Sequence, residues 1–212
     1  LAKYDEWKDT DVVEIATYFL DGVMEEFITK TNGKEAMRRT HNHAKKGRAL
    51  GLGVMGWHTF LQKKNLPFNS IASTAWTHTI MSKIKLEAEA ASRKLAQEYG
   101  EPLWCQGTGM RNTHVMAIAP TVSNSRIAGC SAGIEPQPAN VYTFNGAKGT
   151  FIVKNPELEK LLTERGHNTE KVWDQILADG GSVQNLPNDI LPEEDKEVFL
   201  TFAETNQLAL VQ

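Results

Sequence analysis

The longest helical pattern in the chain covers residues 71–99, and it restricts the fold more than any other feature. Its apolar residues recur at spacings of three and four, which places them on one face of a helix. Gly100 is a typical helix stop. The face consists of Ile80, Ile84, Ala88, Ala91 and Leu95.

A second apolar stripe with helical spacing covers residues 12–30, with Thr10 or Asp11 as N-cap and Asn32–Gly33 as the end. Its members are Val12, Ala16, Phe19, Leu20, Val23, Phe27 and Ile28. Helices therefore dominate the predicted fold. Further helical segments are expected over residues 55–62, 125–128, 156–165, 169–178 and 193–211.

Short apolar segments alternate with these helices. Residues 49–54 read as a short strand or turn, and residues 114–119 as a buried strand ended by Pro120. Residues 141–144 and 149–153 flank Asn145–Gly146, which predicts a hairpin. Helices mixed with buried strands indicate the α/β class.

Composition excludes several kinds of protein. The chain has 212 residues, of which 41% are hydrophobic and 23% charged, so it can form a packed core. A net charge of −3 argues against nucleic-acid binding, and no apolar run reaches the length of a membrane span. The two cysteines fit a reducing compartment such as the cytoplasm. Leu1 and a helical pattern ending at Val211–Gln212 suggest an internal fragment cut at both ends.

Gly51, Gly53 and Gly56 match the dinucleotide-binding pattern G-x-G-x-x-G. That site requires a preceding apolar strand and an acidic residue about 20 positions later, to hold a ribose hydroxyl. Residues 45–48 are instead basic or glycine, and no Asp or Glu occurs from 57 to 86. We therefore expect a tight turn with close backbone packing, and keep a nicotinamide-dependent oxidoreductase as an alternative.

Histidines and cysteines give weak signals. His41 and His43 lie in a basic stretch from Arg38 to Arg48 that would repel a cation, so we expect a solvated basic segment without a metal. Cys105 and Cys130 do not form a C-x-x-C pair, which favours inert thiols over nucleophiles. Surface positions or satisfied core positions are expected for four further histidines: His58, His78, His114 and His167.

The segment after the predicted strand 114–119 is richer in chemistry. Three hydroxyls and one amide occur within residues 121–125, at the end of a strand and before a short helix. Unpaired amides at a helix N-terminus favour a bound phosphate, and α/β folds place ligands at the carboxyl ends of strands. An ordinary N-cap at Ser123 explains the pattern equally well. Glu135, held extended by Pro136, is either a base or, preferably, a structural carboxylate bonded to backbone.

Four segments in this order resemble the large catalytic subunit of class I ribonucleotide reductases, in the version of bacteria and T4-like phages. They are residues 48–56, 119–125, 133–136 and 154–166. The resemblance covers residues 1–212 and implies the C-terminal part of the catalytic barrel domain. The implied fold is part of a helix-rich, ten-stranded α/β barrel of the type shared by ribonucleotide reductases and glycyl radical enzymes.

The resemblance also implies an activity, namely reduction of ribonucleoside diphosphates to deoxyribonucleoside diphosphates by thiyl-radical chemistry. In that family, a cysteine radical abstracts the 3′ hydrogen, a cysteine pair supplies electrons and a glutamate acts as base. The finger-loop cysteine motif, the reducing cysteines and the allosteric sites would precede Leu1, and the radical-relay tyrosines would follow Gln212. No catalytic residue or metal ligand is therefore expected within 1–212, and the chain alone should not turn over.

Carried over by position, the substrate phosphates would be held at Pro120, Thr121, Val122, Ser123, Asn124 and Ser125. This segment would bind no cofactor; ATP or dATP effectors and a metal-containing small subunit that supplies the radical would serve the complete protein. Thioredoxin or glutaredoxin and a second large subunit are the other implied partners, without nucleic acid or membrane. A helical adaptor using the helices at 12–30 and 193–211 stays as a non-enzymatic alternative.

Overall fold

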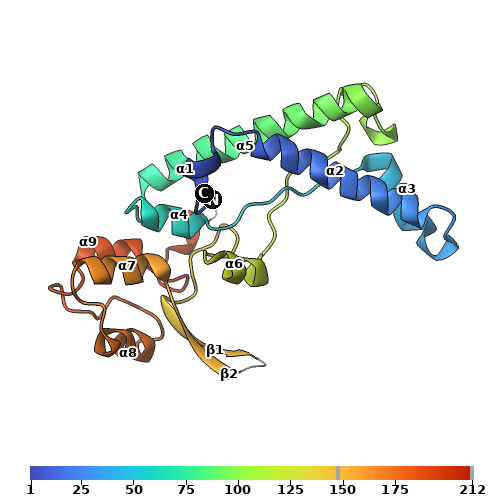
Figure 1. The fold of residues 1–212 in the computed structure, drawn as a ribbon. Coiled ribbons are helices and arrows are strands. Elements are labelled where there is room, and N and C mark those ends of the chain that lie inside the picture. Colours follow the sequence, from blue (N-terminus) through green and yellow to red (C-terminus); the bar gives the residue numbers. More distant parts are fainter. Residues whose placement is uncertain (147–148, 211–212) are drawn as a thin grey trace. The chain divides into compact units, whose positions relative to one another are not determined.

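The computed structural model describes residues 1–146 and 149–210, which form two compact units (Figure 1). The first unit comprises Leu1–Tyr4, Val54–Trp76 and Pro120–Gln212, and the second comprises Asp5–Gly53 and Thr77–Ala119. The α-helices are α1 (Tyr4–Trp7), α2 (Val12–Thr31), α3 (Arg38–Gly47), α4 (Trp57–Lys63), α5 (Ile71–Tyr99), α6 (Val122–Ala128), α7 (Pro156–Glu164), α8 (Glu170–Ala178) and α9 (Glu193–Val198). The 3₁₀ turns are η1 (Glu35–Met37), η2 (Leu103–Cys105) and η3 (Gln207–Leu210), and the strands are β1 (Val141–Gly146) and β2 (Gly149–Lys154).

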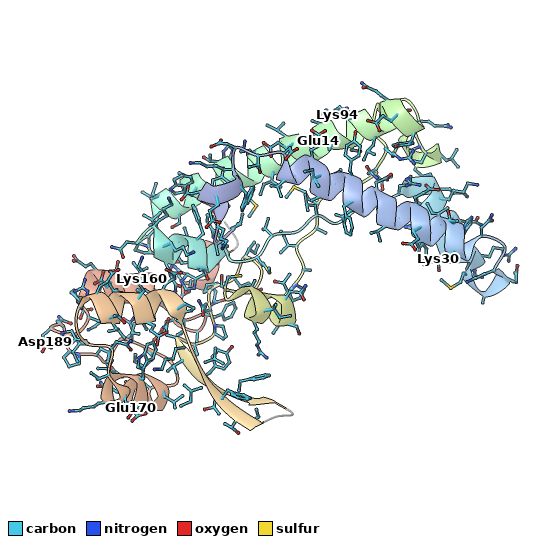
Figure 2. All side chains as sticks on the ribbon, viewed as in Figure 1. Glu14, Lys30, Lys94, Lys160, Glu170 and Asp189 are labelled. Atoms are coloured by element: carbon cyan, nitrogen blue, oxygen red, sulfur yellow. The ribbon has the colours of Figure 1, made fainter. Side chains whose placement is uncertain are left out.

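Helix α5 confirms the prediction of a long helix over residues 71–99. All five residues of its predicted apolar face are at most 2% exposed, and Gly100 follows with a φ of +80°. Within the second unit α5 lies beside α2, because the Tyr18 hydroxyl donates to Glu98 over 2.8 Å. Figure 2 shows Glu14 on α2 and Lys94 on α5 close together, and their charged atoms are 2.6 Å apart.

Helix α2 forms where expected, but the predicted stripe is not its buried face. Its buried side chains are Val13, Thr17, Asp21, Ile28 and Thr31. The Thr17 and Thr31 hydroxyls donate to carbonyls one turn back, Val13 and Phe27, so their burial leaves no donor unpaired. Much of the predicted stripe is exposed instead, including Val12 at 41%, Phe19 at 68% and Val23 at 49%.

A buried charged group explains this orientation of α2. The Asp21 carboxylate accepts two hydrogen bonds from Arg48, at 2.9 and 3.0 Å, and one each from Arg111 and Asn112, both at 2.9 Å. These four bonds use the acceptor capacity of a carboxylate. Burial alone would raise the pKa of Asp21, but the bonds from Arg48, Arg111 and Asn112 outweigh it, and the pKa is lowered. We call Asp21, Arg48, Arg111 and Asn112 the Asp21 cluster.

Arg48 corrects the expectation of a solvated basic segment from 38 to 48. The segment is helix α3, exposed at Arg38, Arg39, Lys45 and Lys46, but Arg48 itself is only 5% exposed. It ends α3 in the left-handed conformation, with φ +46°. Its guanidinium also donates to Glu25 over 2.6 Å, which completes its pairing.

The two segments expected as strands in the second unit run parallel but pair only briefly. Leu52 forms a bridge with Met116, and backbone bonds join Leu50 to His114 and Leu52 to Val115 and Ala117. The prediction of a buried strand over 114–119 is wrong: the segment forms a single bridge at Met116, and His114 and residues 117–119 are exposed.

The first unit has its own core, built on helices α7, α8 and α9. The predicted hairpin is confirmed, with β1 and β2 antiparallel and Val141 paired with Lys154. Asn145 and Gly146, expected between the strands, are instead the last residues of β1, and residues 147–148 lie outside the described residues. Asn155 caps α7 through a bond from the Glu157 amide, and Thr169 caps α8. Buried apolar residues join these elements: Val141, Leu158, Leu162, Val172, Trp173, Ile176, Val183, Leu186, Leu191, Val198 and Phe199. In Figure 2, Lys160 and Glu170 mark the outer sides of α7 and α8, and Asp189 marks the connection to α9.

The predicted helix over 193–211 is wrong in length. Helix α9 ends at Val198, and the Phe202 amide donates to the carbonyl of Gln137, which turns the chain away from a helical path. Glu204 then accepts bonds from the amide and hydroxyl of Thr201, both at 2.8 Å. Residue 211 lies outside the described residues.

A second buried polar group, which we call the His58 network, ties α4 to the rest of the first unit. It comprises His58, Gln62, Asn140 and Asn155, none more than 6% exposed. The Gln137 amide donates to His58 Nδ1 over 2.9 Å, so the neutral ring keeps its proton on Nε2, 3.2 Å from the carbonyl of Val198. Asn155 donates to Gln62 and Asn140, and Asn140 donates to the Phe199 carbonyl.

Candidate functional site

The segment from Pro120 to Ser125 forms a tight entry into α6. Thr121 adopts the left-handed conformation, with φ +48° and ψ +26°, and the helix begins at Val122. The expected helix 125–128 therefore starts three residues earlier than predicted. The alternative that Ser123 is an ordinary N-cap is wrong, since Thr121 is the N-cap residue and no side chain makes a capping bond.

The Thr121 side chain fixes the shape of this loop. Its Oγ1 accepts the Gly133 amide over 2.8 Å, so the hydroxyl keeps its own proton for another acceptor. The Ser131–Gly133 segment is in turn held by α4: the Gly56 amide donates to the Ser131 carbonyl, and Thr59 Oγ1 accepts the Ser131 amide, both over 2.8 Å. Thr121 therefore ties the loop to a segment that is itself fixed on α4.

Ser125 faces inward. It is 4% exposed, its amide donates to Thr121 and its hydroxyl donates to Val122. Both of its donors are used inside α6, so the expectation that the Ser125 amide is open to a phosphate is not met by this geometry. Ser125 supports the loop rather than offering a donor.

The first turn of α6 leaves its amides open. Within the described residues, the N–H groups of Val122, Ser123 and Asn124 have no hydrogen-bond acceptor, and the side chains of all three are exposed. Unpaired amides at the positive end of a helix dipole attract an anion. The arrangement can therefore bind an anionic group with three amides, the Ser123 hydroxyl and the Asn124 amide.

The glycine motif is structural, as expected. A Cβ at Gly53 would lie 2.5 Å from the carbonyl oxygen of Ala117, so only glycine permits the close approach of the two parallel segments. Gly56 has φ +79° and precedes α4 as its N-cap. Both glycines are explained by backbone geometry, which removes the observation behind a dinucleotide site.

The histidines do not gather into a site. His41 Nδ1 lies 3.1 Å from the Thr31 hydroxyl, and the His43 ring packs edge-on against Trp104. His58 is the satisfied core histidine that was one of the expected outcomes, whereas His114 is exposed. Across the part of the chain that the structure describes, no three His, Cys, Asp or Glu side chains are grouped as a metal site requires.

The two cysteines are free and unactivated. Cys105 is buried and Cys130 is half-buried. Burial raises the pKa of both thiols, and the carboxylate of Glu101 raises that of Cys105 further. A raised pKa disfavours the reactive thiolate, in agreement with the interpretation of both as inert thiols.

Glu135, which follows the loop, differs from what the sequence indicated. Glu135 is exposed and, within residues 1–146 and 149–210, makes no hydrogen bond to backbone, so its interpretation as a structural carboxylate is wrong for this chain.

The chain matches the family described as "Ribonucleotide reductase, barrel domain" over residues 2–105 and 104–212. It therefore belongs to the ribonucleotide reductase family, as part of the barrel domain of its large subunit. It is 39% identical over 211 residues to the ribonucleoside-diphosphate reductase large subunit of Invertebrate iridescent virus 6, covering 98% of this chain and 22% of the relative. A putative large subunit of Frog virus 3 is 37% identical over 213 residues, covering 100% of the chain and 37% of the relative.

Among solved structures, the class Id ribonucleotide reductase alpha subunit of Actinobacillus ureae aligns with a TM-score of 0.92 at 45% identity. The alignment covers 100% of this chain and 39% of that one. The chain thus spans between about a fifth and two fifths of these proteins. Within residues 1–146 and 149–210, no helix combines the length and apolar character needed to cross a membrane.

Proposed function

We propose that this chain is part of the large subunit of a class I ribonucleotide reductase, which reduces ribonucleoside diphosphates to deoxyribonucleoside diphosphates for DNA synthesis. Within it, the segment Pro120–Ser125 holds the phosphates of the substrate. The observation that carries the proposal is the set of three unpaired amides at the start of α6, in a chain that belongs to this family.

The loop acts by binding and orientation. Pro120 ends the extended segment, and Thr121 turns the chain so that the amides of Val122, Ser123 and Asn124 face the same side. The Thr121 and Ser123 hydroxyls and the Asn124 side-chain amide add donors, while Ser125 supports the turn from inside. A phosphate fixed in this way places the ribose relative to the radical centre, and such positioning lowers an activation barrier by several kcal/mol.

The rest of the enzyme belongs to the complete large subunit. We infer that residues 1–212 are the C-terminal part of its catalytic barrel, and that the exposed edges of the parallel segments around Leu52 and Met116 pair with further strands of a ten-stranded barrel. The radical cysteine, the reducing cysteines and the ATP or dATP sites lie in other parts of the subunit. A small metal-containing subunit supplies the radical, and thioredoxin or glutaredoxin supplies electrons. The large subunit forms a homodimer and works in the cytoplasm.

The class assignment rests on similarity. The Actinobacillus ureae alpha subunit, at 45% identity, supports a class I enzyme of bacterial type. A vitamin B12-dependent reductase of Thermoplasma acidophilum is 34% identical over 206 residues, so this part of the barrel is similar in both classes. We favour class I, of the kind found in bacteria and T4-like phages. If the complete large subunit requires a separate radical-generating subunit for activity, it belongs to class I and not to the cobalamin class.

The loop is tested in the complete large subunit with the double variant Thr121→Ala and Ser123→Ala. Each hydrogen bond lost to a charged phosphate weakens diphosphate binding by about 1.5–3 kcal/mol, measured as the KM for CDP. Thr121→Ser, which keeps the hydroxyl that accepts the Gly133 amide, separates loss of the contact from loss of loop shape. Thr163→Ala, an exposed threonine on α7, is the matched control. Unchanged affinity in the double variant removes the assignment.

The exposed residues of α2 give the adaptor alternative little support. The second helix that the adaptor alternative requires, over 193–211, is not one element, because α9 ends at Val198. In the proposed subunit, other parts of the protein cover Val12, Phe19 and Val23. The enzyme is therefore the better explanation of the whole chain.

A further inference from the structure

Helix α4 takes its N-terminal cap from a distant part of the chain. Its N-cap residue, Gly56, has no side chain that could bond the first turn. Ser131, 72 residues after Thr59, supplies that bond instead: the Thr59 amide, at the third position of α4, donates to the Ser131 hydroxyl over 3.2 Å. The Ser131 amide donates back to Thr59 Oγ1 over 2.8 Å. This reciprocal exchange is the bonding pattern of a capping box, here split between two segments.

Burial makes the split capping box sensitive to the loss of either hydroxyl. Thr59 is 1% exposed and Ser131 is 3% exposed, so a partner freed there lies out of contact with solvent. The Gly56 amide adds a third bond, to the Ser131 carbonyl over 2.8 Å. The amide, hydroxyl and carbonyl of Ser131 are thus all bonded to the start of α4, which fixes the path of the chain at this point.

The chain that follows Ser131 determines the conformation of Thr121. Thr121 has φ +48°, in the left-handed region that a β-branched side chain disfavours, so its neighbours must hold it there. The Gly133 amide, two residues after Ser131, does so by donating to Thr121 Oγ1 over 2.8 Å. The same bond occupies a lone pair of the hydroxyl and orients its proton away from Gly133.

The other end of α6 is bonded to the same segment. The Cys130 amide donates to the Ser125 carbonyl over 3.0 Å, and Cys130 directly precedes Ser131. The split capping box therefore lies between the bond to the start of α6 and the bond to its last turn. A displacement of Ser131 would reach both Thr121 and Ser125.

We propose that Thr59 and Ser131 are positioning residues for the segment Pro120–Ser125. Both are buried outside that segment, and they act on it through Gly133, which holds Thr121. The inference rests on the proposed function and adds the part of the fold that gives the segment its binding shape. Binding groups must be held within about 0.5 Å of their productive geometry, so loosening the split capping box weakens substrate binding although no substrate contact is removed.

The test measures the KM for CDP in the complete large subunit, assayed with its radical-generating subunit. Thr59→Val removes the hydroxyl at nearly constant volume, and we expect the KM to rise about three- to tenfold, as for one buried hydrogen bond. Thr59→Ser keeps the hydroxyl and restores the native KM. Thr205→Val, which removes a buried hydroxyl bonded to Thr201 in the same unit, is the matched control and leaves the KM unchanged.

A double variant separates positioning from a general loss of stability. Because Thr59 acts through Thr121, the KM of Thr59→Val combined with Thr121→Ala should stay well below the product of the two single effects. Full multiplication of the two effects overturns the inference. If Thr59→Val does not fold, Ser131→Ala, which removes the acceptor of the Thr59 amide, takes its place in the same comparison.

Hydrogen exchange follows the link without turnover. The Gly133 amide should exchange faster in Thr59→Val than in the native protein, because the segment that carries it is released from α4. Unchanged exchange at Gly133, or an unchanged KM for CDP in both Thr59→Val and Ser131→Ala, overturns the inference. If the Thr121→Ala and Ser123→Ala variant still weakens CDP binding in that case, the proposed function stands without this positioning role.

Discussion

The Asp21 cluster and the His58 network, two of the buried polar groups among the described residues, satisfy their polar atoms by different means. The Asp21 cluster buries formal charges, with the Asp21 carboxylate paired to Arg48 and Arg111, and the exposed Glu25 carboxylate outside the cluster balances the second arginine. The His58 network contains only neutral groups, and each side chain finds an amide or carbonyl partner. Buried polar groups without a partner are absent from the described side chains.

The comparison shows how burial cost depends on charge. A charge left unpaired in the interior costs more than an unpaired neutral donor or acceptor. The Asp21 cluster should therefore respond most strongly to the loss of one member. The His58 network should respond most strongly to a proton, which would introduce a charge where there is none.

The largest expected effect is that of Arg48→Met in the complete large subunit. It removes two of the four bonds to the Asp21 carboxylate and leaves the charge partly uncompensated, which costs about 3–5 kcal/mol. The loss is measured as a decrease in the free energy of opening of α2, from amide hydrogen exchange. Arg39→Met, an exposed arginine of the neighbouring helix α3, is the control. A decrease below about 1 kcal/mol would contradict the role given to the cluster.

Low pH should destabilise the His58 network. Burial lowers the pKa of His58 from its ordinary 6.5 to about 4, although the bond to Val198 opposes the shift. Between these values the unfolded chain binds a proton that the folded chain does not. Stability is thus complete above pH 6.5 and is lost as the pH falls toward 4, by about 3 kcal/mol in all at 1.36 kcal/mol per pKa unit.

This pH dependence is measured by hydrogen exchange or thermal unfolding of the complete subunit from pH 7 to pH 4.5. His58→Gln carries no titrating group, so its stability should fall less steeply over the same range. Identical slopes for the two proteins would show that His58 is protonated in the folded state, and the neutral network would then be the wrong description.

The smallest effect is expected from Thr17→Val, one turn before Asp21 on the buried face of α2. The Thr17 hydroxyl bonds only to the Val13 carbonyl of its own helix. Loss of that bond costs about 0.5–1.5 kcal/mol, and the added methyl group returns about 0.8 kcal/mol through burial. The net change in α2 opening should stay below about 1 kcal/mol, and a much larger loss would show that α2 is held by its hydroxyls as well as by Asp21.

These differences also explain what could be predicted from the sequence. The face of α5 and the start of α7 at Pro156 follow from signals within one turn or one helix, whereas Thr169, expected inside a helix, is the N-cap of α8. The rotation of α2 depends on Arg48 and Arg111, which lie 27 and 90 residues away from Asp21. No periodicity contains that information, so the apolar stripe predicted the wrong face.

The same limit applies to the site. The composition of residues 121–125 predicted a loop rich in donors, and the structure places open donors there. The inward orientation of Ser125 and the bond from Gly133 to Thr121 depend on backbone geometry that composition does not specify. Likewise, α9 ends early because Phe202 bonds to Gln137, 65 residues earlier in the chain.

The bond between Thr121 and Gly133 has a consequence for the thermodynamics of ligand capture. A loop already locked in its final shape loses little conformational entropy when an anion arrives, and preorganisation of this kind strengthens binding without any added contact. Calorimetry should therefore find a smaller unfavourable entropy for the native threonine than for an alanine in its place.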